Sequence, residues 1–166
     1  MVRLETFLFL LTVTLVFGQD AEYDSMGYSV RNLEKEYGEK ETLRVFQEGR
    51  IEDRIPSYIK ELYSKNRTEG EETKQIYDEL QAELGENREA NEAWTVVARG
   101  KAASMKDVLD ASFRLDATFG EVNGIVSREK RGFWRWVRRN WRKIVRVVVT
   151  IGSALLQNSR NQYSMG

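Results

Sequence analysis

Apolar residues recur at helical spacing in the middle of the chain. In the segment 71–84, Ile76, Leu80 and Leu84 follow one another at intervals of four residues, and Gly85 comes directly after them. Residues four apart lie on the same face of an α-helix, and glycine is common just past a helix C-terminus. This pattern predicts a helix that ends at Gly85 and turns one face toward a core.

Capping residues predict two more helices downstream. Asn87 is suited to cap a helix that ends before Gly100, because its side-chain oxygen can accept a hydrogen bond from a backbone N–H. Ser104 stands three residues before Asp107, a spacing typical of a capping box at the start of a third helix. Apolar and polar residues alternate over 112–119, which favours a strand there as an alternative.

Two helices are predicted nearer the N-terminus. Pro56 fits the first turn of a short helix that runs to Ser64, and another helix is expected over 31–47, weakened at Gly38. Leu, Ile, Val and Phe make up only 22 of the 113 residues of 19–131, close to the content at which chains stop burying a stable core. The expected fold class is mainly α, with a loosely packed helical region followed by a C-terminal amphipathic helix.

The first 18 residues have the pattern of a secretory signal peptide. A short start with Arg3 is followed by an apolar stretch over 7–17, and Val16 and Gly18 fit a cleavage site after Gly18. The eleven residues of this stretch are too few to cross a hydrocarbon core of ~30 Å. The chain is therefore expected to be secreted, with a membrane anchor or a buried strand as the alternatives for this segment.

Charge is divided unequally between two parts of the remaining chain. Residues 19–131 hold 18 Lys and Arg against 25 Asp and Glu, a net charge of −7. Residues 132–166 hold seven basic residues and no acidic one, a net charge of +7. Opposite charge blocks of this kind suggest a basic functional segment that is masked by an acidic one.

A basic cluster marks the boundary between the two charge blocks. Arg128, Lys130 and Arg131 form an Arg-X-Lys-Arg motif, the pattern that furin-type proprotein convertases recognise. Such a protease is the expected processing partner, cutting after Arg131, and a solvated basic loop is the alternative. The expected parts are a signal peptide over 1–18, an acidic pro-region over 19–131 and a cationic peptide over 132–166.

The stretch 133–156 shows helical spacing along two opposite faces. The apolar face consists of Phe133, Val137, Trp141, Ile144, Val148, Ile151 and Leu155, with Trp134 and Trp136 at its borders. The basic face consists of Arg135, Arg138, Arg139, Arg142, Lys143 and Arg146. A helix of this kind is suited to lie in the plane of an anionic membrane, with its indole rings at the level of the headgroups.

Other structures and partners are open to the same stretch. Seven of the eight residues of 144–151 are β-branched, which favours a strand and aggregation. The apolar face also suits packing on the pro-region as a core helix, so the acidic pro-region is an expected partner in cis. Nucleic acid is expected to be a secondary target of the basic face at most, because the chain is exported and its apolar face is broad.

Composition excludes several kinds of chemistry. Without histidine or cysteine, the chain has no disulfide, thiolate nucleophile, Cys/His zinc site or imidazole-based triad. The carboxylates lie in charge runs, so we expect no enzyme, no catalytic residue, no metal and no cofactor. Two modifications are candidates, namely glycosylation at Asn66 in an Asn-Arg-Thr sequon and amidation of Met165 with loss of Gly166.

The order of signal peptide, acidic pro-region, Arg-X-Lys-Arg site and Trp- and Arg-rich helix resembles the precursors of antimicrobial host-defence peptides. The charge blocks are similar in order to those of arminin-type precursors. The larger pro-region resembles that of cathelicidins, from which this chain differs by having no cysteine. The likeness covers the whole chain as architecture, without a diagnostic motif. It implies that the stretch 133–156, once released, permeabilises bacterial membranes as part of innate immunity.

Two other functions fit the same sequence features. One is a precursor of a signalling peptide that acts on a receptor, because convertase cleavage and C-terminal amidation suit it equally. The other is an uncleaved, secreted helical binding protein, in which the apolar stripe is an ordinary core face.

Overall fold

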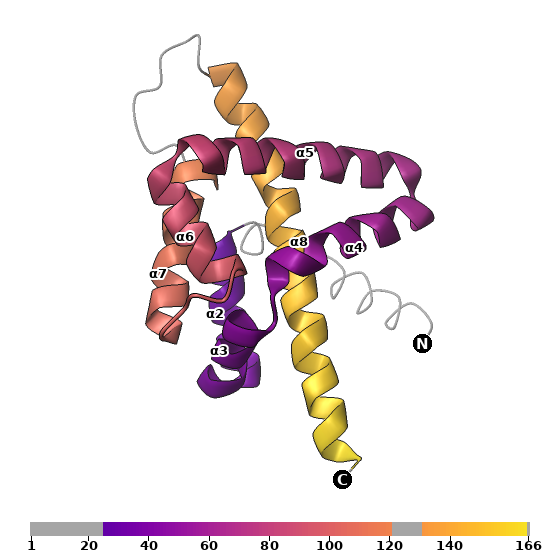
Figure 1. Ribbon diagram of the computed structural model, residues 1–166, viewed down its shortest axis with the longest axis vertical. Coiled ribbons are helices and arrows are strands. Elements are labelled where there is room, and N and C mark those ends of the chain that lie inside the picture. Colours follow the sequence, from indigo (N-terminus) through magenta and orange to yellow (C-terminus); the bar gives the residue numbers. More distant parts are fainter. Residues whose placement is uncertain (1–24, 121–130, 166) are drawn as a thin grey trace, which may run out of the picture.

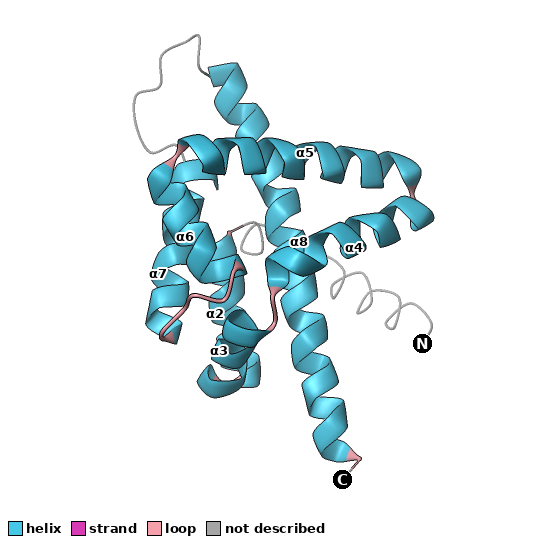
Figure 2. Ribbon diagram, viewed as in Figure 1, coloured by secondary structure: helices cyan, strands magenta, loops and turns pink. Residues whose placement is uncertain are grey.

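The computed structural model describes residues 25–120 and 131–165, and over 131–139 it describes the backbone alone. This part of the chain is mainly helical and contains no strand. Figure 2 shows its helices joined by short loops. The predicted signal peptide with Gly18, and the processing residues Arg128 and Lys130, lie outside the described residues.

The helix expected over 31–47 is divided into two, α2 (Met26–Tyr37) and α3 (Glu39–Glu48), with Gly38 between them. Gly38 has a φ of 89°, in the left-handed region that residues with a side chain rarely adopt. Its N–H donates to the carbonyl oxygen of Glu34 at 2.8 Å and so closes α2. The glycine therefore ends one helix and starts the next.

Helix α4 (Ile51–Lys65) begins earlier than the sequence pattern predicts. Pro56 is its sixth residue and not part of its first turn, so that prediction is wrong. Ile51, Ile55 and Ile59 lie four residues apart and are all buried. Burying this whole face outweighs the one backbone hydrogen bond that a proline removes from a helix.

Helix α5 (Arg67–Glu86) and helix α6 (Arg88–Ala98) are separated by Asn87. The side-chain oxygen of Asn87 accepts a hydrogen bond from the N–H of Ala90 at 3.1 Å, which confirms the predicted cap. Gly85 lies inside α5, so the prediction that it ends the helix is wrong. The chain leaves the helix two residues later because the backbone of Asn87 is extended, as a cap requires.

Helix α7 (Met105–Leu115) begins at the predicted cap and continues into a short π-helical turn, η1 (Asp116–Gly120). The hydroxyl of Ser104 accepts from the N–H of Asp107 at 3.2 Å. The strand considered for 112–119 is not formed. Its alternating pattern is overridden because the buried residues of this stretch follow helical spacing.

Helix α8 (Arg131–Ser164) runs past the other helices at both ends (Figure 1). It contacts α2, α3, α4, α5 and η1. Asn66 is the cap residue between α4 and α5. Figure 1 shows these two helices as a V whose arms both cross α8. The stretch 144–151 is helical despite its seven β-branched residues, because helical spacing places five of them in the core, namely Ile144, Val145, Val147, Val148 and Ile151.

One hydrophobic core joins the acidic region and α8. Trp94, Phe46 and Ile55 of the acidic region are 0 to 2% exposed, and Ile144 of α8 belongs to the same cluster. Loose packing was expected from the composition of 19–131 considered by itself. The apolar residues of α8 complete the core, which is why the large side chains of the acidic region are so well covered.

Candidate functional site

The side of α8 that faces the acidic region carries much of the predicted apolar stripe. Its fully buried members are Trp141, Ile144, Val148 and Ile151, each at most 7% exposed, and Leu155 is partly buried. The contact is wider than the stripe. Its additional buried members are Val145, Val147 and Leu156. The acidic region therefore covers more than one narrow face of the helix.

The predicted basic face of α8 is described from residue 140 onward. Arg142 and Arg146 are exposed, and the ammonium group of Lys143 pairs with the carboxylate of Glu72 on α5. The predicted site residues whose side chains lie outside the described part are Phe133, Trp134, Arg135, Trp136, Val137, Arg138 and Arg139. Over 141–151, the apolar residues of α8 are buried or partly buried, while Arg142 and Arg146 are exposed.

A buried carboxylate, that of Asp116 in η1, joins α8 to the start of α2. Its Oδ1 accepts hydrogen bonds from the N–H of Met26 at 2.8 Å and from Nε1–H of Trp141 at 3.0 Å. Its Oδ2 accepts from the N–H of Gly27 at 2.8 Å and from the hydroxyl of Ser25 at 2.5 Å. The first N–H groups of a helix lack partners within it, and the positive end of the helix dipole favours a carboxylate. Asp116 thus satisfies the start of α2 and positions Trp141.

The indole ring of Trp141 lies against η1. Its centroid is 5.2 Å from that of the Phe119 ring, and the two planes are inclined by 33°. A Cβ atom at Gly120 would lie 2.8 Å from Cδ1 of Trp141, so the glycine leaves the space that the ring occupies. Trp141 is therefore held by a hydrogen bond at its edge and by packing around its ring.

The far end of α8 is fixed by polar contacts with α2 and α3. The guanidinium of Arg160 donates to the carbonyl oxygen of Glu36 at 2.7 Å and lies 4.3 Å from the ring centroid of Tyr37. The hydroxyl of Ser159 accepts from the guanidinium of Arg44 at 2.7 Å. Together with Asp116, these residues anchor α8 at two places far apart along its length.

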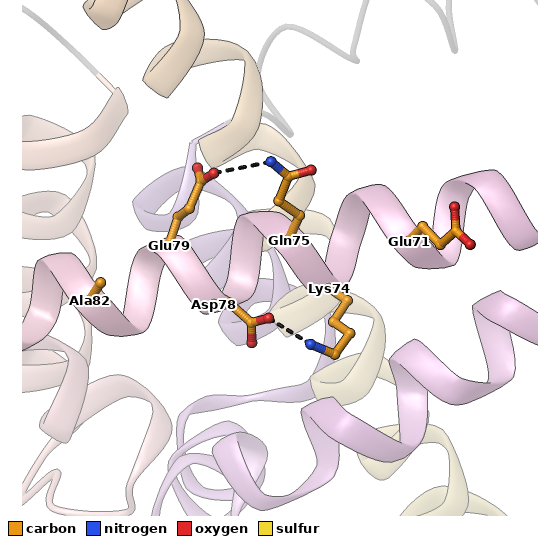
Figure 3. Close-up of a pocket in the computed structure, with 6 residues that line it drawn as sticks. All are labelled: Glu71, Lys74, Gln75, Asp78, Glu79 and Ala82. Carbon is orange, nitrogen blue, oxygen red and sulfur yellow. Dashed lines mark hydrogen bonds and ion pairs between the residues drawn. The ribbon is translucent and has the colours of Figure 1, made fainter.

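An open depression on α5 lacks the arrangement of an active site. Its lining, drawn in Figure 3, consists of Glu71, Lys74, Gln75, Asp78, Glu79 and Ala82. Lys74 donates to Asp78 at 2.6 Å and Gln75 donates to Glu79 at 3.3 Å. All six residues belong to one helix, and these polar groups pair along it. The depression therefore brings no acid and base together from different elements.

The carboxyl of Glu71, at the edge of this depression, is not tuned to act as a general acid. Hydrogen bonds from the hydroxyl of Tyr63 at 3.0 Å and from Arg67 at 3.2 Å hold the pKa of this carboxyl below its ordinary value. A general acid that works near neutral pH needs a raised pKa. Within the described ranges, no group of acidic side chains is placed to hold a metal ion.

The two predicted modification residues are exposed, and of the predicted cleavage residues only the backbone of Arg131 is described. Asn66 is exposed at the turn between α4 and α5, and its side-chain oxygen accepts from the N–H of Glu69 at 3.3 Å. Met165 is 89% exposed. Arg131 is the first residue of α8, so the predicted cut falls in the first turn of a helix. Glycosylation, amidation and cleavage remain predictions.

The sequence patterns did not indicate the role of Asp116. Its one signal is its register, because it follows the buried Ser112 by four residues and the buried Val108 by eight. An acidic residue that continues a buried helix face needs hydrogen-bond donors from elsewhere in the fold. Which donors these are depends on the tertiary structure.

Comparison with known proteins gives no match to a protein-family model, to a curated protein or to a solved structure. Within the residues that the structure describes, none of the helices combines the length and apolar character that crossing a membrane requires. The fold and the site define a helical protein in which an acidic region encloses one side of a basic C-terminal helix.

Proposed function

We propose that the chain is a secreted precursor of a membrane-active antimicrobial peptide. In this proposal a signal peptide over 1–18 directs export and a proprotein convertase cuts after Arg131. The segment 132–166 then binds and permeabilises anionic bacterial membranes as a cationic amphipathic helix. The acidic region 19–131 masks it until then.

The observation that carries the proposal is the burial of the apolar stripe of α8. Trp141, Ile144 and Val148 are 1 to 3% exposed because the acidic region covers them, whereas Arg142 and Arg146 are exposed. The side chains that a membrane helix would insert into lipid are therefore buried against the acidic region in the uncut chain. A mask of this kind supports a precursor whose activity depends on removal of the acidic region.

Approximate energies favour binding of the released peptide to anionic lipid. Each basic residue near an anionic surface contributes about 1 kcal/mol, so the six of 135–146 give roughly 4–6 kcal/mol before screening by salt. Each large apolar side chain that enters lipid adds about 1.5 kcal/mol or more. Ordering the backbone costs about 1–2 kcal/mol per residue, so the peptide is expected to be unfolded in water and helical on lipid.

Leakage of dye from vesicles tests the proposal. Synthetic 132–166 is expected to release dye from anionic vesicles at micromolar concentration, whereas the uncut chain 19–166 releases little at the same concentration. The D-enantiomer of the peptide should act equally well, because lipid recognition needs no chiral partner. A peptide without activity on anionic vesicles would refute the proposal. An L-peptide that acts on cells while its D-form is inert would favour the signalling function.

Matched substitutions test which face of the peptide meets lipid. Val148→Glu places a charge among residues of the apolar stripe and is expected to abolish leakage. Thr150→Glu introduces the same charge at a position that is exposed in the folded chain, and most leakage should remain. Equal leakage by both variants would contradict the proposed orientation.

The shared core also favours a second function, that of an uncleaved secreted helical binding protein. A helix whose apolar face is buried against its own chain is equally an ordinary core helix. Mass spectrometry of the secreted product separates the two functions. A product that begins at Gln19 and ends at Gly166 supports the binding protein, whereas fragments separated after Arg131 support the precursor.

A further inference from the structure

We infer that cleavage after Arg131 does not by itself free the C-terminal helix. Residues 25–120, here called the body, keep the fragment 132–166 bound after the cut, and an anionic bilayer is what removes it. This inference rests on the proposed function and adds a second step to it. The protease cuts the chain but leaves the fragment bound, and contact with anionic lipid then releases the peptide.

The described contacts that hold α8 lie ten residues or more beyond the cut. Trp141 is bound by Asp116 near one end, and Arg160 is bound by Glu36 near the other. Cleaving the peptide bond after Arg131 breaks none of these contacts. The cut removes only the covalent connection between the two parts. The fragment is therefore expected to stay bound unless other contacts replace those with the body.

Separation in water would expose apolar surface on both parts. The fragment would expose the seven buried apolar side chains of α8, namely Trp141, Ile144, Val145, Val147, Val148, Ile151 and Leu156. The body would expose the partners of these side chains, which belong to the same core or, for Leu156, to a smaller cluster with Leu33 and Val45. Because 19–131 is poor in large aliphatic residues, it has little apolar material with which to close the gap. Both parts therefore favour the complex in water.

An anionic bilayer offers replacements for both kinds of contact. Arg142 and Arg146 are exposed on the folded chain, so they can meet anionic headgroups while α8 is still attached. Lys143 and Glu72 form a partly exposed ion pair, which a lipid phosphate can replace. The apolar side chains then move from one apolar environment into another. Neutral lipid lacks the attraction that starts this exchange.

Size-exclusion chromatography of the cut chain tests retention. The purified chain 19–166 is cut with a furin-type convertase, and mass spectrometry establishes the cut after Arg131. Both fragments are expected in one peak at micromolar concentration. Elution of 132–166 by itself would overturn the inference. Co-expression of 19–131 and 132–166 as separate chains is expected to give the same complex, so the inference is tested even where the convertase leaves the chain uncut.

Vesicle flotation tests the release step on the same complex. With anionic vesicles, fragment 132–166 is expected to float with the lipid while 19–131 stays behind. With neutral vesicles, both fragments are expected to stay behind together. Retention of the complex in the presence of anionic vesicles, or equal release by neutral ones, would overturn the role assigned to anionic lipid.

Graded variants keep the retention test informative even if one of them fails to fold. Val148→Glu is expected to separate the cut fragments, whereas Thr150→Glu, which puts the same charge on an exposed position, leaves them together. Ile144→Ala is milder and should raise the fraction of fragment 132–166 that is released on dilution by tenfold or more. Equal retention by Ile144→Ala and the unaltered chain would count against the buried face as the holding surface.

The outcomes separate this inference from the proposed function on which it rests. A peptide that permeabilises vesicles but leaves the body on cutting refutes the inference and keeps the proposed function. A peptide that stays bound to the body but is inert toward every vesicle refutes the proposed function. Retention would then describe a two-chain form of the helical protein.

Discussion

The indole Nε1–H of Trp141 donates a hydrogen bond to Oδ1 of Asp116 across 3.0 Å. The two residues lie on opposite sides of the charge boundary, one in the basic C-terminal helix and the other in the acidic region. The same carboxylate accepts hydrogen bonds from the first two N–H groups of α2. Loss of Asp116 should therefore remove hydrogen bonds in two places, at the start of α2 and between η1 and α8.

Replacing Asp116 by alanine is expected to lower the free energy of unfolding by about 2–4 kcal/mol, because buried N–H donors lose a charged acceptor. Urea denaturation of the chain 19–166, followed by circular dichroism, measures the loss. Asp110→Ala is the matched control on α7. Asp110 has a 57% exposed side chain paired with Lys106, so its loss should cost less than about 0.5 kcal/mol. Similar losses for the two variants would contradict the role of Asp116.

Two glycines of α5 should respond in opposite directions to alanine. A Cβ at Gly70 would lie 2.5 Å from Cα of Tyr63 in α4, whereas a Cβ at Gly85 has no neighbouring atom within 4 Å. Gly70→Ala is expected to lower the free energy of unfolding by about 1–3 kcal/mol by forcing α4 and α5 apart. Gly85→Ala should raise it by about 0.5–1 kcal/mol through helix propensity. Thermal unfolding of the two variants in parallel checks this, and a stabilising Gly70→Ala would contradict the packing of α4 on α5.

The stability of the protein should fall in alkaline solution partly through Tyr77. Burial raises the pKa of its phenol to about 12, and the negative charge of Glu52 acts in the same direction. The phenol therefore keeps its proton to higher pH in the folded chain than in the unfolded chain. Its contribution to the free energy of unfolding is complete below pH 10 and is lost as the pH rises toward 12. Tyr77→Phe is thus expected to reduce the fall in urea midpoint over this range. Tyr163→Phe removes a phenol that is 79% exposed and should leave the fall unchanged.

Salt should weaken the binding of the peptide 132–166 to anionic vesicles. The screening length falls from about 10 Å at 0.1 M salt to about 3 Å at 1 M, so the attraction of the basic residues is largely lost. The blue shift of tryptophan fluorescence on titration with vesicles reports binding. Neutral vesicles serve as the control, with weak binding that depends little on salt. Salt-independent binding to anionic vesicles would show that apolar contacts alone carry the affinity.

The features that the sequence predicts well are local ones. Asn87 and Ser104 bond to N–H groups three residues away, so their caps are visible in short stretches of sequence. The apolar stripe of α8 is likewise a repeat along one helix, and its members Trp141, Ile144 and Val148 are buried as a set. For such features, residue type and spacing already determine the interaction.

The features that the sequence did not reveal depend on residues far apart in the chain. Asp116 accepts from Met26, 90 residues away, and no local pattern relates the two. Pro56 was misplaced because buried isoleucines on both sides of it extend α4 in the N-terminal direction. The packing of 19–131 was underestimated because part of its core comes from α8. Each of these outcomes is decided by which helices meet.

The absence of a side chain at Gly120 has a consequence for the evolution of this chain. The Trp141 ring lies where a methyl group at position 120 would clash with it. A single-codon change to alanine would therefore push the indole away from Asp116 without altering any residue of the C-terminal segment. Under the proposed function, such chains would keep the sequence of the peptide 132–166 but hold it less firmly, so selection for retention of the peptide would also act on residue 120, which lies outside it.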